Sequence, residues 1–372
     1  MSDIIGKTVE CKSGKHYTVL ECLNEGVFGK IYKVIDRNYN ESMAMKVFLN
    51  THPSAMEKSW QLETDALKCV QSTADEMNIV KMTDYGSIRD ENLPRKMSNR
   101  YIVMNLLGKS LYQTLNPKNE QQIETLAFEN SDIVEIGYQI AVAMKHLQSL
   151  NILHLDLKPE NVCFVKVNNQ IKSKRLFDGR LLLSMENTQI KLIDIGCCRF
   201  IENNSKTKSS DVVNIEVQTQ NYRAPEVFLG LGFSKKSDIW SFGCVLSELY
   251  TGELLFFGGA NNEHSEEVQM DMMQSTLRRA VPYSMLQKAF DLGSQKVMDT
   301  KHGIRYRKEN VARIVESPTI FCNIRPSDFQ GCQLYDLILD CLEMDPEDRP
   351  NFAEILEYQF FNRKTDRLIT LE

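Results

Sequence analysis

The chain has 372 residues, of which 42% are hydrophobic and 25% are charged, and its formal net charge is −6. This length exceeds one small core and suits two packed lobes or domains. The composition excludes a disordered chain, and the acidic balance gives no reason to expect nucleic acid or an anionic membrane as a partner.

The N-terminal stretch MSDIIGKTVECKSGKHYT lacks the long apolar core of a signal peptide, and no segment approaches the roughly 20 apolar residues of a membrane span. The 10 cysteines show no paired zinc spacing, and Cys197 and Cys198 are adjacent, which suits reduced thiols. These features predict a soluble intracellular protein of the nucleus or cytoplasm, and we expect it to be a monomer.

The N-terminal part predicts a small β-rich lobe. HYTVLECL, KIYKVID and MAMKVFL, within residues 16–49, are short β-rich runs separated by turn residues and indicate a three-stranded meander. A helix is expected over SAMEKSWQLETDALKCV, with Pro53 and Ser54 as its start signal. Strands around KMTDYGSI and RYIVMNLL complete a sheet of about five strands with one helix.

After Gly108 the pattern becomes helical, as in DIVEIGYQIAVAMKHLQSL, SDIWSFGCVLSELYTG, EVQMDMMQSTLRRAV and LYDLILDCLEMD. The boundary near Leu107 has no Gly/Ser linker, so the two parts are expected to share a hinge and a cleft. Residues 172–185, KSKRLFDGRLLLSM, interrupt two short strands and are predicted to be a surface insertion.

A glycine-containing turn, NEGVFGKI from Asn24 to Ile31, lies between two of the predicted strands. Gly26 and Gly29 would let backbone N–H groups approach phosphates, because a Cβ would obstruct that approach. Asn24 stands where the G-x-G-x-x-G pattern begins with Gly, and Asn is the residue that best tolerates a positive φ in its place. Taken alone, the motif fits an ordinary hairpin better.

One strand later, Lys46 is flanked by Ala44 and Val47 on a strand that would direct its side chain to the cleft. A buried lysine needs an anionic partner, and a phosphate and Glu63, from QLETDAL, can both serve. Taken singly, Lys46 would more often be a surface residue.

The segment HLDLKPEN and the later DIG carry the decisive pattern. Phosphoryl transfer has a diffuse anionic transition state and requires positioning and charge neutralisation. Asp156 can orient or deprotonate an incoming hydroxyl, and Lys158 can neutralise the transferring phosphate. Asn161 and Asp194 can hold Mg²⁺, which prefers oxygen ligands. The four motifs occur in one order with suitable spacing, which a chance arrangement of polar residues does not explain.

These motifs resemble those of eukaryotic protein kinases, and the resemblance extends from about His16 to Phe361. NYRAPEV, KSDIWSFGCVLSELYTGELLF and MDPEDRPNFAEILEYQFF match later segments of that family. YRAPE and LGLGFSKKSDIW resemble the CMGC group, and within it THPSAMEKSWQLETDAL and LQSLNILHLDLKPENV look most like homeodomain-interacting protein kinases, near the dual-specificity tyrosine-regulated kinases.

The resemblance implies an α+β fold with two lobes, a small ATP-binding lobe over residues 16–107 and a larger, mostly helical lobe over 108–361. Residues 1–15 and 362–372 would be short terminal extensions. It also implies that Glu226 pairs with Arg349 and that Asp238 braces the backbone of the HLDLKPEN segment, residues 154–161, which is the catalytic loop of the family. The adenine of ATP would contact Ala44, Met104, the backbone of Asn105 to Leu107, and Cys163.

Two departures from the family pattern bear on activity. Leu155 replaces the Arg of H-R-D, which in the family clasps a phosphorylated activation loop, so its loss concerns regulation. Ile195 replaces the Phe of D-F-G, and the smaller apolar contact is expected to cost on the order of 1 kcal/mol, at roughly 25 cal/mol per Å². Asp194 and Gly196 are retained.

A third departure lies in the loop from Cys197 to Gln220, which corresponds to the activation loop of the family. Glu216 occupies the position of a tyrosine that the resembled kinases phosphorylate during maturation. Glu216 would be a fixed negative charge pairing with Arg223, and a solvated Glu is an equally good interpretation. The loop also carries Ser205, Ser209 and Ser210 as further candidate phosphorylation sites.

The sequence therefore predicts a serine/threonine protein kinase that uses ATP and Mg²⁺ to phosphorylate protein substrates. By analogy Arg223 favours sites followed by proline. The alternative is a pseudokinase scaffold, supported by Asn24, Leu155 and Ile195. A metabolic small-molecule kinase is disfavoured, because RAPE and the segment after it build a groove for a peptide.

Overall fold

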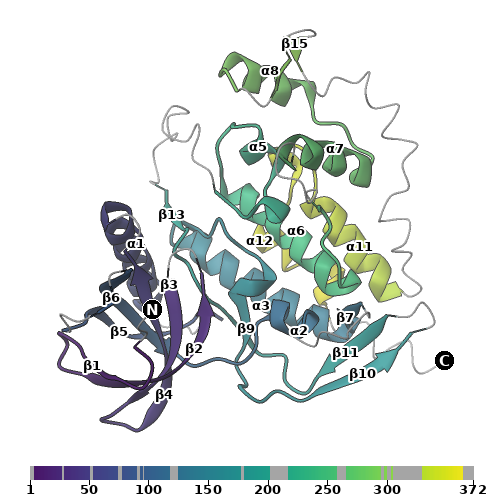
Figure 1. Cartoon of the computed structure of the whole chain (residues 1–372). Helices are drawn as coiled ribbons and strands as arrows, with labels where there is room; N and C mark the ends of the chain where they lie inside the picture. The colour runs from purple at the N-terminus through teal and green to yellow at the C-terminus, as the bar shows by residue number, and fades with distance from the viewer. Residues whose placement is uncertain are drawn as a thin grey trace.

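The fold is described from a computed structural model of the whole chain. The residues that it describes are 4–26, 29–50, 53–73, 78–89, 93–94, 96–117, 125–176, 180–201, 217–257, 265–294, 297–299, 303–304 and 329–362. In this part of the chain a sheet-rich lobe and a helical lobe lie side by side (Figure 1). No helix among these residues is long and apolar enough to cross a membrane.

The N-terminal lobe is built on a six-stranded antiparallel sheet in the order β1-β2-β3-β4-β6-β5. Its strands are β1 Thr8–Glu10, β2 His16–Glu25, β3 Gly29–Asp36, β4 Glu41–Leu49, β5 Met82–Ser87 and β6 Met97–Asn105. The helix α1, Pro53–Gln71, packs against β4, β5 and β6. It begins at the Pro53 that the sequence marks as its start.

The sheet has one strand more than the five expected, because β1 lies in the stretch predicted to be a terminal extension. β1 has only three residues, too few to show the alternation that identifies a strand. The segment after it is anchored by the carboxylate of Asp84, which accepts hydrogen bonds of 2.9 to 3.0 Å from Ser13, Tyr17 and Tyr101. The small lobe therefore starts before residue 16.

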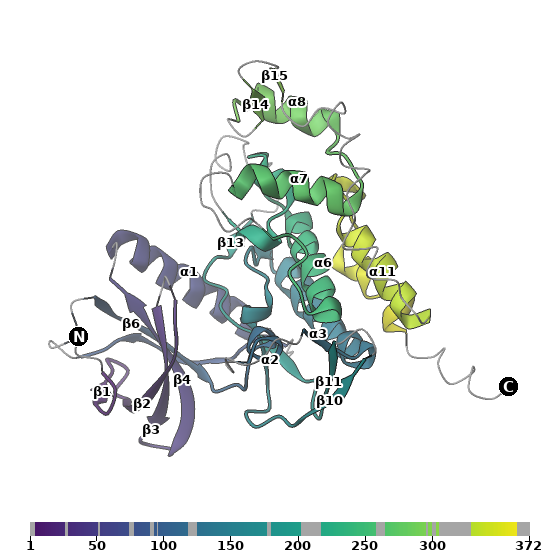
Figure 2. The same cartoon turned by 45° about the vertical axis from the view of Figure 1, so that its right-hand side comes forward.

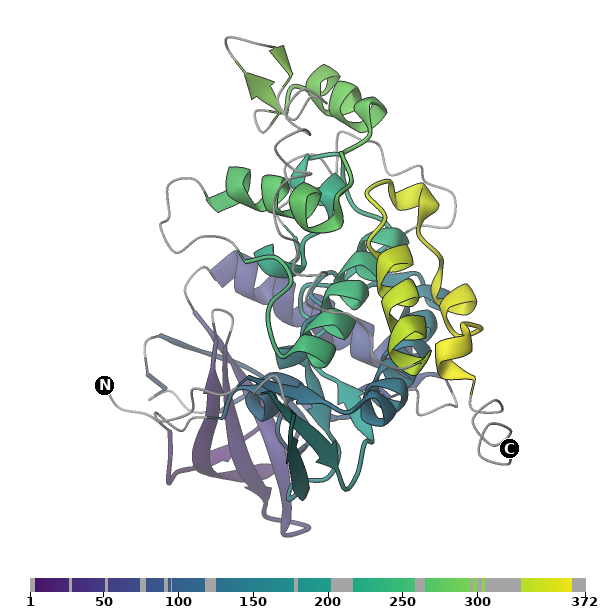
Figure 3. The same ribbon diagram turned by 90° about the vertical axis from the view of Figure 1, so that its right-hand side faces the viewer.

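The C-terminal lobe is mostly helical, and α6, Lys235–Thr251, runs through its centre. A Ser234 capping box starts α6, and Gly252 ends it in the left-handed conformation. Every residue of α6 from Ser237 to Leu249 is buried. It packs against α3, Asn130–Ser149, and α11, Phe329–Cys341 (Figures 2 and 3). Among the residues that the structure describes, the other α-helices of this lobe are α2 Leu111–Leu115, α5 Pro225–Phe228, α7 Ser265–Leu277, α8 Tyr283–Asp291 and α12 Phe352–Ile355.

The described part of the predicted surface insertion forms two paired strands. Strands β10, Ile171–Arg175, and β11, Leu181–Met185, pair with each other, and β11 adds in parallel to β7, Leu126–Phe128. Leu183 and Met185 are buried, whereas all of β10 is exposed. The sequence of β10 therefore resembles a polar loop although it forms a strand.

Short paired strands carry the segments between the lobes and around the catalytic loop. They are β8 Ile152–Leu153 with β13 Arg199–Phe200 and β9 Val162–Phe164 with β12 Ile190–Leu192. A further pair, β14 Met298–Asp299 with β15 Gly303–Ile304, lies beside α8 at the far end of the large lobe (Figure 1). The connection from β6 to α2 passes through Gly108, whose N–H donates to the Phe164 carbonyl. A Cβ at Gly108 would lie 2.3 Å from the Lys166 carbonyl oxygen, so only glycine fits here.

Candidate active site

Lys46 and Glu63 form a buried ion pair that joins β4 to α1. Lys46 Nζ lies 2.8 Å from Glu63 Oε2 and 2.8 Å from Asp194 Oδ1, so one ammonium contacts two carboxylates. The side chains of Lys46 and Glu63 are 6% and 2% exposed, whereas that of Asp194 is 41% exposed. This network fixes α1 relative to the sheet and leaves part of the Asp194 carboxylate open to solvent.

The charges in this network follow from burial and from the shared lysine. Burial would lower the pKa of Lys46, but Asp194 and Glu63 together raise it above its usual value. Burial would also raise the pKa of Asp194, and the Lys46 ammonium holds it below its usual value. Burial raises the pKa of Glu63 to about 7 in spite of Lys46. Lys46 and Asp194 are therefore charged at neutral pH.

Neighbouring side chains hold both carboxylate oxygens of Asp156, which lies in the catalytic loop. Thr219 Oγ1 donates to Asp156 Oδ1 over 2.6 Å, and Lys158 Nζ lies 2.9 Å from Asp156 Oδ2. Lys158 also donates to Thr219 Oγ1 over 2.8 Å, which closes a ring of three side chains. A carboxylate held in this way has a fixed orientation, as a group that must meet an incoming hydroxyl requires.

Asn161 connects this ring to Asp194. Its Nδ2 donates to the Asp156 carbonyl over 2.9 Å and to Asp156 Oδ2 over 3.2 Å, which leaves Oδ1 as the amide atom for a cation. Its carbonyl accepts from the N–H of Ile193, the residue before Asp194. Burial, together with the nearby charges of Asp156 and Asp194, raises the pKa of the Cys197 thiol to about 11. The predicted site residues of HLDLKPEN and DIG therefore lie next to one another.

The backbone of the catalytic loop is braced from α6. Asp238 accepts hydrogen bonds from the N–H groups of His154, over 3.0 Å, and Leu155, over 2.9 Å, as the resemblance implied. Leu155 is fully buried and has a φ of 58°, a strained conformation for a non-glycine residue. The Leu155 carbonyl in turn accepts from the N–H of Gln218 over 3.0 Å. This bond ties the catalytic loop to the end of the activation segment without the missing arginine.

Asn24 does not adopt the conformation that the sequence predicts for it. Asn24 lies in β2 opposite Ile31, and its φ is not among the positive values found in the described residues. The expected conformational cost at Asn24 therefore does not arise, and its Oδ1 accepts from the N–H of Glu25. A Cβ at Gly29 would approach the Val47 carbonyl to 2.8 Å, whereas Gly26 has space.

The residues expected around adenine lie where β4, β6 and β9 approach the connection between the lobes. Ala44 and Met104 are Cα partners across β4 and β6, and both are 7% exposed. Asn105 and Leu107 are partly exposed at the end of β6. Cys163 is buried in β9, and burial raises the pKa of its thiol to about 12, so the thiol stays neutral.

Ile195 and Gly196 complete the DIG motif. Ile195 is 1% exposed and belongs to the continuous core of the protein, so the smaller side chain leaves no exposed apolar surface. A Cβ at Gly196 would lie 2.9 Å from Glu63 Oε2, a carboxylate that the ion pair with Lys46 holds in place. Glycine is therefore required where this turn passes the ion pair.

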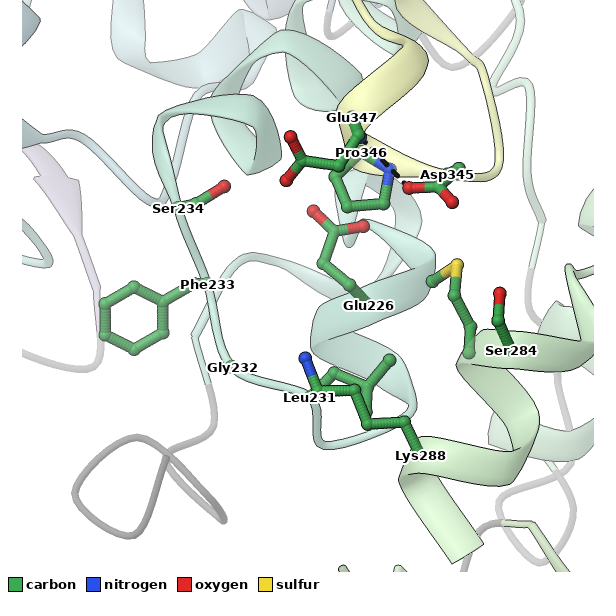
Figure 4. A pocket seen from close by; sticks show the side chains of 11 residues that line it. Glu226, Leu231, Gly232, Phe233, Ser234, Ser284, Lys288, Asp345, Pro346 and Glu347 are labelled. Atoms are coloured by element: carbon green, nitrogen blue, oxygen red, sulfur yellow. Dashed lines mark hydrogen bonds between the residues drawn. The ribbon is translucent and has the colours of Figure 1, made fainter. Parts of the chain in front are cut away.

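The pair of Glu226 and Arg349 anchors the segment after the activation loop. The guanidinium donates to both carboxylate oxygens over 2.9 and 2.8 Å and lies over the Trp240 ring. Next to this pair, a cavity of about 350 Å³ opens between α8, the loop before α6 and residues 345–347 (Figure 4). Its lining residues include Leu231, Phe233, Met285 and Lys288.

Two residues of the site were not identified from the sequence. Thr219 orients Asp156, and Gln218 bonds the catalytic loop and, through Nε2, the Ser237 carbonyl and Ser241 Oγ in α6. The only available signal was the place of Thr219, seven residues before Glu226 in QTQNYRAPE. Glu216, which the sequence predicts to pair with Arg223, lies outside the described residues. So do the candidate phosphorylation sites Ser205, Ser209 and Ser210.

A bilobal fold with a charged pair in the small lobe and a braced Asp-Lys-Asn loop in the large lobe defines a protein kinase fold. Comparison with known proteins agrees, because the family described as "Protein kinase domain" matches residues 17–361. The chain belongs to the protein kinase family. A crystal structure of a kinase domain superposes with a TM-score of 0.75 at 27% identity, over 97% of this chain and 98% of that chain.

Three curated relatives place the chain more finely. Serine/threonine-protein kinase Doa of Drosophila melanogaster is 29% identical over 93% of this chain and 39% of its own length. Probable dual specificity protein kinase madd-3 of Caenorhabditis elegans is 30% identical over 95% and 36%, and human dual specificity protein kinase CLK4 is 29% identical over 95% and 68%. The chain spans less than half the length of Doa and madd-3. These relatives confirm that the chain belongs to the CMGC group. Within this group it belongs to the branch of the CLK kinases and the dual-specificity tyrosine-regulated kinases.

Proposed function

We propose that the protein is a serine/threonine protein kinase that transfers the γ-phosphoryl group of ATP to protein hydroxyls. The observation that carries the proposal is the ring of Asp156, Lys158 and Thr219, joined through Asn161 to the network of Lys46, Glu63 and Asp194. A site of this kind supplies orientation and charge neutralisation, which are the main demands of phosphoryl transfer.

Lys46 is proposed to bind phosphate oxygens of ATP. Its ammonium is charged, nearly buried and held by Glu63, so its position is fixed before ATP arrives. Ala44, Met104 and Cys163 would contact the adenine with Asn105 and Leu107 beside it, and Gly26, Gly29, Asn24 and Ile31 would cover the phosphates.

Asn161 and Asp194 are proposed to bind Mg²⁺. Both offer oxygen atoms, and Asn161 Nδ2 is already engaged by Asp156, so the donor set fits a hard cation. When bound, Mg²⁺ neutralises charge on the phosphates. The partly exposed Asp194 carboxylate is ionised by the influence of Lys46, which such binding requires.

Asp156 is proposed to receive the proton of the acceptor hydroxyl, and Lys158 to neutralise the transferring group. Thr219 fixes the orientation of both side chains, because its hydroxyl donates to Asp156 and accepts from Lys158. The serine/threonine assignment rests on Lys158, the arrangement typical of such kinases, and on relatives whose names include serine/threonine and dual specificity kinases.

The backbone next to Thr219 supports a preference for proline after the acceptor. Arg223 Nη2 donates to the Gln218 carbonyl over 3.1 Å, and Arg223 Nε donates to the Val217 carbonyl over 3.1 Å. Gln218 has a φ of 64°, and Arg223 already occupies its carbonyl, which is then not available to a substrate N–H. A substrate residue with a free N–H would lack this partner, whereas proline has no N–H to satisfy.

The partners of such an enzyme would be ATP and protein substrates, and we propose an intracellular protein of the nucleus or cytoplasm that acts as a monomer. A pseudokinase scaffold is the alternative function. The side chains that phosphoryl transfer needs are present in two hydrogen-bonded groups, and a backbone bond from Ile193 to Asn161 links these groups. This arrangement favours the enzyme.

The proposal is tested with labelled ATP, Mg²⁺ and a generic basic protein. The wild-type chain is expected to transfer label and the Asp194→Asn variant to transfer almost none. Absence of transfer from both, with ATP still bound, would support the scaffold. A peptide library then tests the proline preference, which predicts at least a tenfold higher kcat/KM for Ser-Pro than for Ser-Ala peptides.

A further inference from the structure

Trp60 and Arg100 form an aromatic and cationic cluster beside α1, the helix that carries Glu63. The proposed chemistry does not use this cluster. Trp60 lies on α1 three residues before Glu63, so both are on neighbouring turns of one helix face. Its indole N–H donates to the Tyr101 carbonyl of β6 over 3.2 Å, and its side chain is buried. This bond joins the helix that carries Glu63 directly to the sheet.

Arg100, the preceding residue of β6, lies over the outer face of the same indole. Its guanidinium carbon is 4.3 Å from the centre of the Trp60 ring, a cation–π contact. Its Nε and Nη2 donate to Glu57 over 2.8 and 2.6 Å, and Nη1 donates to Ser87 Oγ over 2.7 Å. One guanidinium therefore bridges α1, β5 and β6 while it covers Trp60.

The fork geometry makes this contact more than a surface ion pair. A guanidinium that makes a bidentate ion pair and also stacks on a ring has little rotational freedom. Lysine cannot reproduce both interactions. Arg100 is 28% exposed, so solvent screens part of the charge but not the stacking. The contact secures the stretch of α1 that begins at Glu57 and includes the turn of Glu63.

We infer that Trp60 and Arg100 are positioning residues for phosphoryl transfer: they clasp α1 to β6 so that Glu63 stays within reach of Lys46 without a second protein. The inference rests on the proposed function. Loss of the clasp would allow α1 to move away from the sheet, which releases Lys46 from Glu63. ATP would then bind only the fraction of molecules in which the pair is intact, and its apparent affinity would fall by that fraction.

The test compares the full-length wild type with Arg100→Ala, Arg100→Lys and Trp60→Phe. Arg89→Ala is the matched control, because Arg89 forms a 2.7 Å ion pair with Glu10 in the same lobe and that pair does not involve α1. The measurements are KM for ATP, KM for a peptide substrate, kcat, binding of a fluorescent ATP analogue, and amide hydrogen exchange in residues 56–70.

Arg100→Ala is expected to raise KM for ATP about tenfold and to accelerate exchange in residues 56–70. The peptide KM should stay the same, and kcat at saturating ATP should change less than threefold. Arg100→Lys and Trp60→Phe should give intermediate values, and Arg89→Ala should match the wild type. A lower kcat with both KM values unchanged would mean that the cluster serves folding only, and would overturn the inference.

Unchanged exchange and unchanged ATP affinity in both Arg100→Ala and Trp60→Phe would overturn it as well. The experiment also separates this inference from the proposed function. If the wild type bound the ATP analogue but transferred no phosphate, the proposed function would fail, while the exchange and binding measurements would still decide the role of the clasp.

Discussion

Thr219 Oγ1 donates a 2.6 Å hydrogen bond to Asp156 Oδ1 and accepts one of 2.8 Å from Lys158. One hydroxyl thus links the proposed proton acceptor to the proposed phosphate-binding cation. Neither the acid nor the lysine can turn without breaking a charge-assisted bond, each worth about 1.5–3 kcal/mol. Thr219 therefore belongs to the site as much as the residues of the two motifs.

Thr219→Ala should lower kcat about 10- to 100-fold, because Asp156 and Lys158 lose the group that fixes them. Thr219→Ser keeps the hydroxyl and should stay within about threefold of the wild type. Steady-state kinetics with a saturating peptide measure both, and circular dichroism checks that the variants are folded. Equal kcat values for the two variants would contradict this role.

The stability of the large lobe should fall as pH rises from about 5 to about 7.5. Burial raises the pKa of Glu248 to about 7, although the Tyr222 hydroxyl, which donates to it over 2.6 Å, lowers it. An unfolded glutamate loses its proton near pH 4.3, so above that pH the folded state holds a proton that the unfolded state has released. Each rise in pH across this window therefore favours the unfolded state, and the fall levels off once the folded Glu248 also loses its proton, above about pH 7.

Urea denaturation at pH 5, 6, 7 and 8 measures this effect. Glu248→Gln should flatten the slope in part, since burial also raises the pKa of Asp238 to about 7 and that of Asp132 to about 6. Glu347→Gln, an exposed substitution, is the control. A slope identical in Glu248→Gln and the wild type would show that Glu248 does not titrate in this window.

Removal of one partner of the buried pair Glu226–Arg349 should destabilise the protein strongly. Arg349 has a fully buried side chain, so Glu226→Ala would leave its charge unpaired and cost about 3–5 kcal/mol. Glu10→Ala, which breaks the exposed pair with Arg89, should cost less than about 1 kcal/mol. Chemical denaturation gives both free energies, and similar values for the two variants would be inconsistent with the account.

Activity should not depend on phosphorylation of the activation segment. Leu155 provides no cation for a phosphate, and the end of the segment is held by Gln218 and Arg223 through backbone carbonyls. Phosphatase-treated protein, with mass spectrometry to verify removal, should keep its turnover within about twofold. A loss of tenfold or more would mean that a phosphate does what these bonds are proposed to do.

Much of the fold and site follows from local patterns in the sequence. Lys46, Glu63, Asp156, Asn161 and Asp194 stand in short motifs whose order specifies the chemistry, and the structure brings them together. The bracing by Asp238 and the pairing of Glu226 with Arg349 followed from the resemblance. Each of these depends on residue type at a fixed place, which a sequence shows directly.

What the sequence did not reveal depends on contacts between distant segments. Strand β1 is too short to show alternation, and β10 exposes all of its residues, so burial leaves no pattern in either. Trp60 could be placed on a helix, but its partner Arg100 lies 40 residues later on β6. The positive φ values of Leu155 and Gln218 are likewise not indicated by residue type, because neither residue favours the left-handed region.

The measurement that tests the central claim most directly is phosphate transfer by the wild type and Asp156→Asn, with ATP binding measured on the same preparations. A positioned general base contributes about 10²–10⁴-fold. We predict equal ATP affinity for the two proteins and a loss of transfer of at least about 100-fold in the variant. Equal transfer by both proteins, or ATP binding without any transfer by the wild type, would contradict the assignment of this protein as a working kinase.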